Sequence, residues 1–133
     1  MIQIATLYLI TAAVFLLLDA VMLTTVMKPL FSQHIGSWLL EDIRLRPAII
    51  FYLFYVGGVL WFVSLPALRG DAPMNALIGG AILGAMAYGT YEFTNYATLR
   101  DWSLQMVAAD VTWGAALTAI SAWTGVMATR LLV

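Results

Sequence analysis

The sequence predicts an all-α, polytopic membrane protein, a four-transmembrane-helix bundle that forms one domain over residues 1–133. The first observation behind this prediction is composition, because 63% of the residues are hydrophobic and 10% are charged, whereas soluble domains carry about 25% charged residues. The second is the grouping of the apolar residues into four runs, each long enough to cross a hydrocarbon core of about 30 Å. We therefore expect lipid to surround most of the chain.

The first expected helix covers residues 4–27, an apolar run interrupted by a single acid. The only long link follows it, over residues 28–46, and contains Pro29, the single histidine His34 and several charged residues. We expect the part near residues 31–43 to lie along the membrane interface as an amphipathic segment. His34 is interpreted as a solvated or interfacial histidine rather than a ligand or pH switch.

The other expected helices cover residues 47–68, 75–98 and 103–127. Pro47 suits the first position of a helix, because the N–H group that it lacks would be unpaired there in any case. Residues 69–73, Arg-Gly-Asp-Ala-Pro, have the composition of a tight turn. Arg100 and Asp101 mark the last turn, so the three later helices are joined by short connections.

Four helices place both chain ends and the turn at residue 69 on one side of the membrane, and the long link and the turn at residue 100 on the other. The basic residues divide unequally between these sides, with two on the terminal side and four on the link side: Arg69 and Arg130 against Lys28, Arg44, Arg46 and Arg100. Cytoplasmic loops carry an excess of Lys and Arg. We therefore expect the link in the cytoplasm and both termini outside.

Composition also excludes several classes of function. Seven acidic and six basic residues leave a net charge of -1, whereas proteins that bind nucleic acids carry a basic surface. We therefore expect no nucleic-acid partner. No cysteine is present, so disulfides, thiolate metal sites and cysteine nucleophiles are excluded. No Ser-His-Asp set, phosphate loop or nucleotide fingerprint occurs. We expect no catalytic residue set, and no motif indicates a cofactor.

Small residues recur at helical spacing in the third and fourth helices, as in Gly80-x-x-x-Gly84 and around Gly114. In lipid, such residues allow two helix backbones to approach closely. We interpret them as packing positions within the chain, with a dimer face as the alternative. Trp61, Trp102 and Trp123 lie near the expected helix ends, where aromatic belts anchor membrane proteins.

Three acids lie inside the expected helices, where a charged side chain costs about 2.5 kcal/mol or more. Asp19 is nine residues before Lys28, Glu92 is eight before Arg100, and Asp110 is ten after Arg100. At helical rise, each acid is then about 12 to 15 Å from the same boundary. The three carboxyls are therefore predicted to share one layer between the helices.

Further polar and aromatic residues fall at a similar depth, and we include them in a candidate ligand-binding site: Tyr52, Tyr55, Asn95 and Trp113. Three carboxylates in a dry space cannot all remain ionised without a cation. They could share protons with neighbouring hydroxyls, bind a cation or cationic ligand, or be neutralised by arginines reaching inward. The lack of Lys or Arg inside the helices favours the first two possibilities.

Oxygen ligands suit hard cations such as Mg²⁺, Ca²⁺ or Mn²⁺, so Asp19, Glu92 and Asp110 are also candidate metal ligands. The alternative is that the acids hold the helices together through hydrogen bonds and have no further function. The shared depth favours a functional site over that structural interpretation.

The segment Tyr91 to Trp102, YEFTNYATLRDW, and residues 110–114, DVTWG, resemble the signature of a bacterial family catalogued as domain of unknown function 2177. Leu18-Asp19, Phe51-Tyr52 with Tyr55 and Gly58, and Pro66-Ala67-Leu68 fit the same pattern, so the resemblance covers nearly the whole chain. Met22 and Ser103 depart from it, since family members more often have tryptophan and proline there. The resemblance implies a four-helix bacterial inner-membrane protein of unknown activity.

Three hypotheses of function remain open. The first is a small-ligand, cation or proton site at the polar layer that serves transport, probed by substituting the three acids. The second is an accessory subunit that packs, as a homo-oligomer or within a larger membrane complex, with the acids holding its helices together. The third is an intramembrane enzyme that acts on lipids, with one carboxyl as general acid or base. An enzyme is the least favoured, because no nucleophile accompanies the acids.

Overall fold

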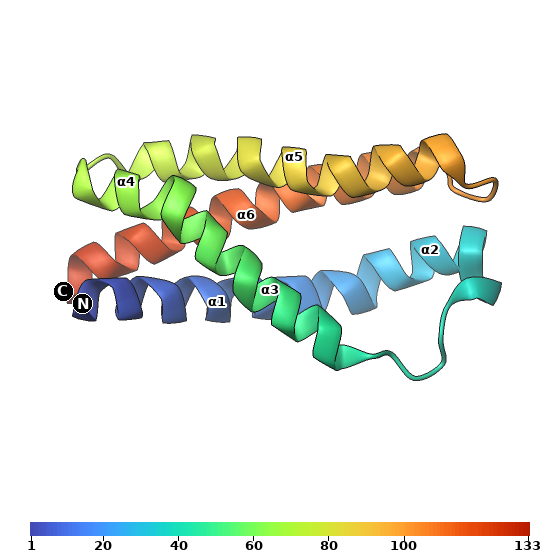
Figure 1. Cartoon of the computed structure of the whole chain (residues 1–133), viewed down its shortest axis with the longest axis horizontal. Helices are drawn as coiled ribbons and strands as arrows, with labels where there is room; N and C mark the ends of the chain where they lie inside the picture. The colour runs from blue at the N-terminus through green and yellow to red at the C-terminus, as the bar shows by residue number, and fades with distance from the viewer.

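Four long helices, arranged as an all-helical bundle, account for nearly the whole chain (Figure 1). The structure is a computed structural model and describes residues 1–133. Its third and fourth helices are uninterrupted, and its first two each contain a wider, π-helical turn. In chain order the elements of the first helix are α1 (Ile2–Met22), a π turn (Leu23–Met27), α2 (Lys28–Ile35) and a 3-10 turn (Gly36–Trp38). The later elements are α3 (Leu45–Val59), a π turn (Leu60–Ser64), α4 (Leu65–Arg69), α5 (Pro73–Thr98) and α6 (Leu104–Leu132).

Each π turn precedes a proline. Pro29 follows the turn Leu23–Met27 and lies in the first turn of α2, and Pro66 follows the turn Leu60–Ser64 and lies in the first turn of α4. A proline inside a regular α-helix removes a hydrogen bond and clashes with the carbonyl four residues back. A π turn shifts the hydrogen-bond pattern by one residue, which explains how both helices continue past their prolines.

This arrangement changes the expected boundaries of the first link. The first helix does not end at Met27 but continues through α2, so only residues 39–44 connect the last 3-10 turn to α3. The first part of the segment expected to lie along the interface, residues 31–35, is therefore the end of a long helix. The second helix begins at Leu45, which places Pro47 at its third position rather than its first.

The two ends of the bundle differ in which connections they carry (Figure 1). Both termini and the turn between α4 and α5 lie at one end, named here the terminus face. The end of α2 and the turn between α5 and α6 lie at the other, named here the link face. The most extensive packing is between α5 and α6, and α1 packs against α6. Helix α3 crosses the bundle obliquely, and its first half diverges from the other helices.

Glycines allow α5 and α6 to pack backbone to backbone. A Cβ atom added to Gly80 would lie 2.8 Å from the Cα of Ala119, and one added to Gly84 would lie 2.8 Å from Oγ1 of Thr118 and against the carbonyl of Gly114. Such separations leave no room for a side chain. The Gly80-x-x-x-Gly84 pattern therefore serves contacts within the chain.

The bundle interior and its outer surface are both rich in apolar residues. A core cluster that includes Phe15, Val56 and Leu117 fills the centre, while side chains such as Leu17 and Phe54 are exposed on the outside. Three helices are long and apolar enough to cross a membrane: Ile2–Trp38, Leu45–Arg69 and Leu104–Leu132. The fourth, α5, is less apolar because it contains Gly, Tyr, Thr and Asn. The whole fits a helical membrane bundle.

At the terminus face, an ion pair ties the end of α6 to the turn between α4 and α5. The guanidinium of Arg130 lies 2.8 Å from the carboxylate of Asp71, whose side chain is largely exposed. Asp71 has a φ of 52°, a left-handed conformation that Asp and Asn tolerate better than other residues with a side chain.

Candidate functional site

Asp19 lies on α1 with its carboxyl facing α6. Its Oδ1 atom accepts a hydrogen bond of 3.1 Å from the indole Nε1 of Trp113, and 8% of the residue is exposed. Tyr52 of α3 approaches the same carboxyl, and its ring packs against Phe15, one turn before Asp19, with centroids 5.5 Å apart. Three helices therefore meet around this acid.

Glu92 on α5 is completely buried. Its Oε1 atom accepts a hydrogen bond of 2.9 Å from the indole Nε1 of Trp102, while its Oε2 atom is buried with no partner. Because buried polar atoms are nearly always hydrogen-bonded, an unpartnered carboxyl oxygen needs a specific explanation.

Trp102, which holds Glu92, belongs to the turn between α5 and α6. It was expected near the membrane surface as part of an aromatic belt, but only 7% of it is exposed. Its ring makes edge contacts with Phe31 of α2 and Tyr91 of α5, at centroid distances of 5.6 and 5.8 Å. The extension of the first helix into α2 provides the first of these contacts. Trp102 thus closes the carboxyl site on the side of the link face.

Asp110 on α6 lies between the other two acids. Its half-buried carboxyl is close enough to interact with those of Glu92 and Asp19. The structure therefore brings the three acids into one layer, and no basic side chain enters it. All link-side basic residues are exposed, namely Lys28, Arg44, Arg46 and Arg100, and the single salt bridge lies at the terminus face.

Tyr88 is a member of this layer that was not expected. Its hydroxyl is buried with no partner, it lies near Asp19 and Tyr52, and its ring packs edge-on against Tyr55 at 6.4 Å. Tyr88 precedes Glu92 by four residues, so helical spacing places both side chains on one face of α5. That spacing was a usable sequence signal for it.

The remaining expected site residues have different partners. Tyr55 forms a hydrogen bond of 2.9 Å with Thr118 rather than with an acid. Asn95 is half-buried one turn nearer the link face, beside Tyr91, and makes no hydrogen bond to the acids. We use the name carboxyl layer for the residues that do gather: Asp19, Tyr52, Tyr88, Glu92, Asp110 and Trp113.

The geometry of the carboxyl layer bears on what it can bind. No group of three or more His, Cys, Asp or Glu side chains is arranged to hold a metal ion. The three acids are neighbours in a layer, but they do not converge on one point as ligands of a divalent metal do. His34 is not part of the carboxyl layer; its Nδ1 lies 3.2 Å from the carbonyl oxygen of Leu30 in its own helix.

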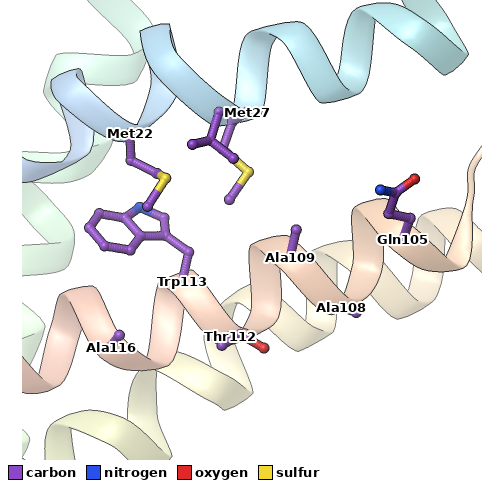
Figure 2. Close-up of a pocket in the computed structure, with 9 residues that line it drawn as sticks. Met22, Met27, Gln105, Ala108, Ala109, Thr112, Trp113 and Ala116 are labelled. Carbon is purple, nitrogen blue, oxygen red and sulfur yellow. The ribbon is translucent and has the colours of Figure 1, made fainter.

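An open groove of about 460 Å³ runs along the outside of the layer, between the first helix and α6. Figure 2 shows Met22 and Met27 on one side of it and Trp113 on the other. The Trp113 indole lines this groove and binds Asp19. It therefore separates the carboxyl layer from the apolar outer surface of the bundle.

Comparisons with known proteins agree with this architecture. The family model described as "Predicted membrane protein (DUF2177)" matches residues 4–127, which include most of each of the four helices and every residue of the carboxyl layer. Searches of curated proteins and of solved structures give no match. Because the match extends over nearly the whole chain, this protein belongs to the DUF2177 family of predicted membrane proteins.

Proposed function

We propose that the carboxyl layer is an exchangeable binding site for protons and a small monovalent cation, and that the protein uses it for transport across the membrane. The observation that carries this proposal is the state of Glu92. Its side chain is fully buried, and one of its carboxyl oxygens accepts a hydrogen bond from the Trp102 N–H. The only polar group next to its other oxygen is the carboxyl of Asp110.

Charge balance favours a site that exchanges its occupant. Neighbouring carboxylates in a dry environment repel one another and lose their hydration, so a proton or a cation must compensate them. No Lys or Arg side chain is available inside the layer. The second oxygen of Glu92 has only the Asp110 carboxyl as a neighbour that could donate a hydrogen bond, and that carboxyl can donate only while it holds a proton.

The other side chains of the layer indicate a monovalent occupant. Tyr52, Tyr88 and Trp113 lie near the acids, and aromatic rings can attract a cation such as an ammonium group. The lack of a three-ligand metal group argues against a divalent ion, which needs several converging oxygen ligands.

The decisive experiment measures cation-driven proton movement in vesicles. The purified protein is reconstituted into liposomes that contain a pH-sensitive dye, and gradients of sodium, potassium or choline chloride are imposed in turn. We expect at least one of these cations to drive protons in the opposite direction. Glu92→Gln should abolish this exchange, because a neutral amide cannot alternate between a proton and a cation.

A matched control is the same change at Glu41, an exposed acid in the link, which should leave exchange unchanged. Glu92→Gln is a conservative test because glutamine keeps a carbonyl oxygen to accept the Trp102 N–H. Exchange that persists in Glu92→Gln, or its absence from the folded wild-type protein with all three cations, would refute the proposal.

We also propose that the protein resides in a bacterial inner membrane with the link face in the cytoplasm. This orientation rests on the greater number of basic residues at the link face. The chain has no cysteine, so single cysteines can report its topology. In intact cells, a membrane-impermeant maleimide should label Ala72→Cys at the terminus face and not Ser37→Cys at the link face; the reverse pattern would invert the orientation.

A further inference from the structure

Between the carboxyl layer and the terminus face, the bundle buries a second set of polar side chains. They come from α1, α6 and the π turn before α4, and each is at most 1% exposed. We name this set the hydroxyl strip: Thr11, Ser64, Thr118, Ser121 and Thr129.

These hydroxyls behave differently from those on the outside of the helices. Several exposed threonines bond to a backbone carbonyl three or four residues earlier in their own helix: Thr24, Thr25, Thr90 and Thr98. Within the strip, by contrast, four hydroxyls have no partner: Thr11, Ser64, Ser121 and Thr129. Burying an unpartnered hydroxyl is unfavourable, and valine or alanine would fill the same volume. Packing alone therefore does not account for the strip.

Tyr55 lies between the strip and the aromatic edge of the carboxyl layer. The Tyr55 hydroxyl is 2.9 Å from Oγ1 of Thr118, and the Tyr55 ring packs against Tyr88. Beyond Thr118, positions 121, 125 and 129 follow along one face of α6 at intervals of three and four residues. Position 125 is Gly125, and Thr11 of α1 packs against it, so that a hydroxyl is present at every step.

The series is long enough to reach the terminus face, because Asp110 is predicted to lie about 15 Å from the link-side boundary and only the other half of the membrane remains to be spanned. Asp110 and Thr129 are nineteen residues apart on α6, which at helical rise corresponds to about 28 Å. The hydrocarbon core of a bilayer is about 30 Å thick. Polar groups therefore extend from the acids to the terminus face, where Arg130 directly follows Thr129.

We propose that the hydroxyl strip is a proton route between the carboxyl layer and the terminus face. This inference rests on the proposed exchange function of the layer. A hydroxyl donates one hydrogen bond and accepts others, so it can accept a proton from one neighbour while it releases its own to the next. Because four strip hydroxyls do not bond to one another, the transfer passes through bridging waters. Each hydroxyl is unchanged after a transfer. Toward the link face, Trp102 covers Glu92, so the strip is the polar path that leaves the layer.

The test removes single hydroxyls and measures the rate of cation-driven proton exchange in the vesicles described above. We expect Ser121→Ala and Thr129→Val each to slow exchange about tenfold, because each removes one polar group that would hold a bridging water in the route. Thr129→Ser, which restores a hydroxyl, should recover the wild-type rate. Thr98→Val is the matched control, because Thr98 is exposed and bonded to its own helix, and its rate should equal that of the wild type.

A second measurement separates this inference from the function on which it rests. In detergent solution, adding the same chloride salts should release protons from the carboxyl layer equally in wild type, Ser121→Ala and Thr129→Val, because the acids are unchanged. Normal proton release with slowed exchange supports the route. Exchange at the wild-type rate in both hydroxyl variants overturns the route, whereas loss of proton release in Glu92→Gln alone shows that the site itself still functions as proposed.

Discussion

The two halves of the bundle bury their polar groups in different ways. In the half near the link face, two of the three buried acids accept hydrogen bonds from tryptophans, Glu92 from Trp102 and Asp19 from Trp113. In the half toward the terminus face, α5 and α6 approach through Gly80, and hydroxyls replace acids. We infer that the close backbone contact between α5 and α6 mainly stabilises the fold, whereas the acid–tryptophan hydrogen bonds mainly position the carboxyl groups of the site.

The largest expected effect on stability comes from the glycine contact. Gly84→Ala would place a Cβ atom against the Gly114 carbonyl, a backbone atom that cannot move without shifting α6. We expect a loss of about 3 kcal/mol in the free energy of unfolding, at the upper end for overpacking. Unfolding in mixed detergent micelles, followed by circular dichroism, measures it.

The matched control for this prediction is Gly57→Ala, since nothing lies within 4 Å of a Cβ atom at that position. The control should leave the stability unchanged or slightly raise it, because alanine favours helix more than glycine. If Gly84→Ala and Gly57→Ala were equally stable, the backbone contact at Gly84 would not be a source of the stability of this fold.

The second effect concerns the donor that holds Glu92. Trp102→Phe removes the indole N–H that donates to Oε1 of a fully buried carboxyl. We expect a loss of about 2 kcal/mol, the cost of an unsatisfied buried acceptor. The control is Trp61→Phe, because Trp61 is 72% exposed. In a double-mutant cycle with Glu92→Leu, the two losses should be less than additive; additive losses would mean that the pair does not interact.

A smaller effect is expected for the corresponding bond to Asp19. Trp113→Phe removes its 3.1 Å hydrogen bond, but Asp19 retains slight exposure and Tyr52 as a neighbour. The loss in unfolding free energy should be about 1 kcal/mol. Trp123→Phe, at a partly exposed position on the same helix, should have no measurable effect. A loss as large as that of Trp102→Phe would show that the two tryptophan pairs are equivalent.

The smallest effect is expected at the terminus face. Asp71→Asn removes the ion pair with Arg130 while keeping a residue type that tolerates a positive φ. Because Asp71 is largely exposed, the loss should be below about 1 kcal/mol, and it should vanish at high salt concentration. Asp42→Asn in the link serves as the control. A loss that persists at high salt would indicate a role for Asp71 beyond its charge.

The helical membrane architecture was predictable because it depends on composition and run length, which are local properties. The third helix ends at Thr98, as expected, because the charged residues Arg100 and Asp101 end the apolar run. The end of the first helix was not predictable, because Pro29 and the polar residues after it normally indicate a boundary. The π turn that accommodates Pro29 depends on hydrogen bonds that residue type does not reveal.

Part of the candidate site was also predictable. Depth along a helix follows from counting residues, and it placed Asp19, Glu92 and Asp110 in one layer. The direction in which a side chain points depends on the rotation of each helix about its axis, which packing sets. Tyr88 could have been found from its four-residue spacing to Glu92, whereas the sequence does not show that Tyr55 bonds to Thr118 and not to an acid.

Composition and hydropathy were enough to predict a bundle of four helices that fits a membrane, and residue counting was enough to predict where along its helix each acid lies, because hydropathy and helical rise act residue by residue. Only the tertiary structure decided that Trp102 turns inward from a loop to hold Glu92, that Gly84 meets the backbone of α6, and that buried hydroxyls continue the polar layer. These features depend on contacts between residues far apart in the chain, so they are settled when the helices pack together.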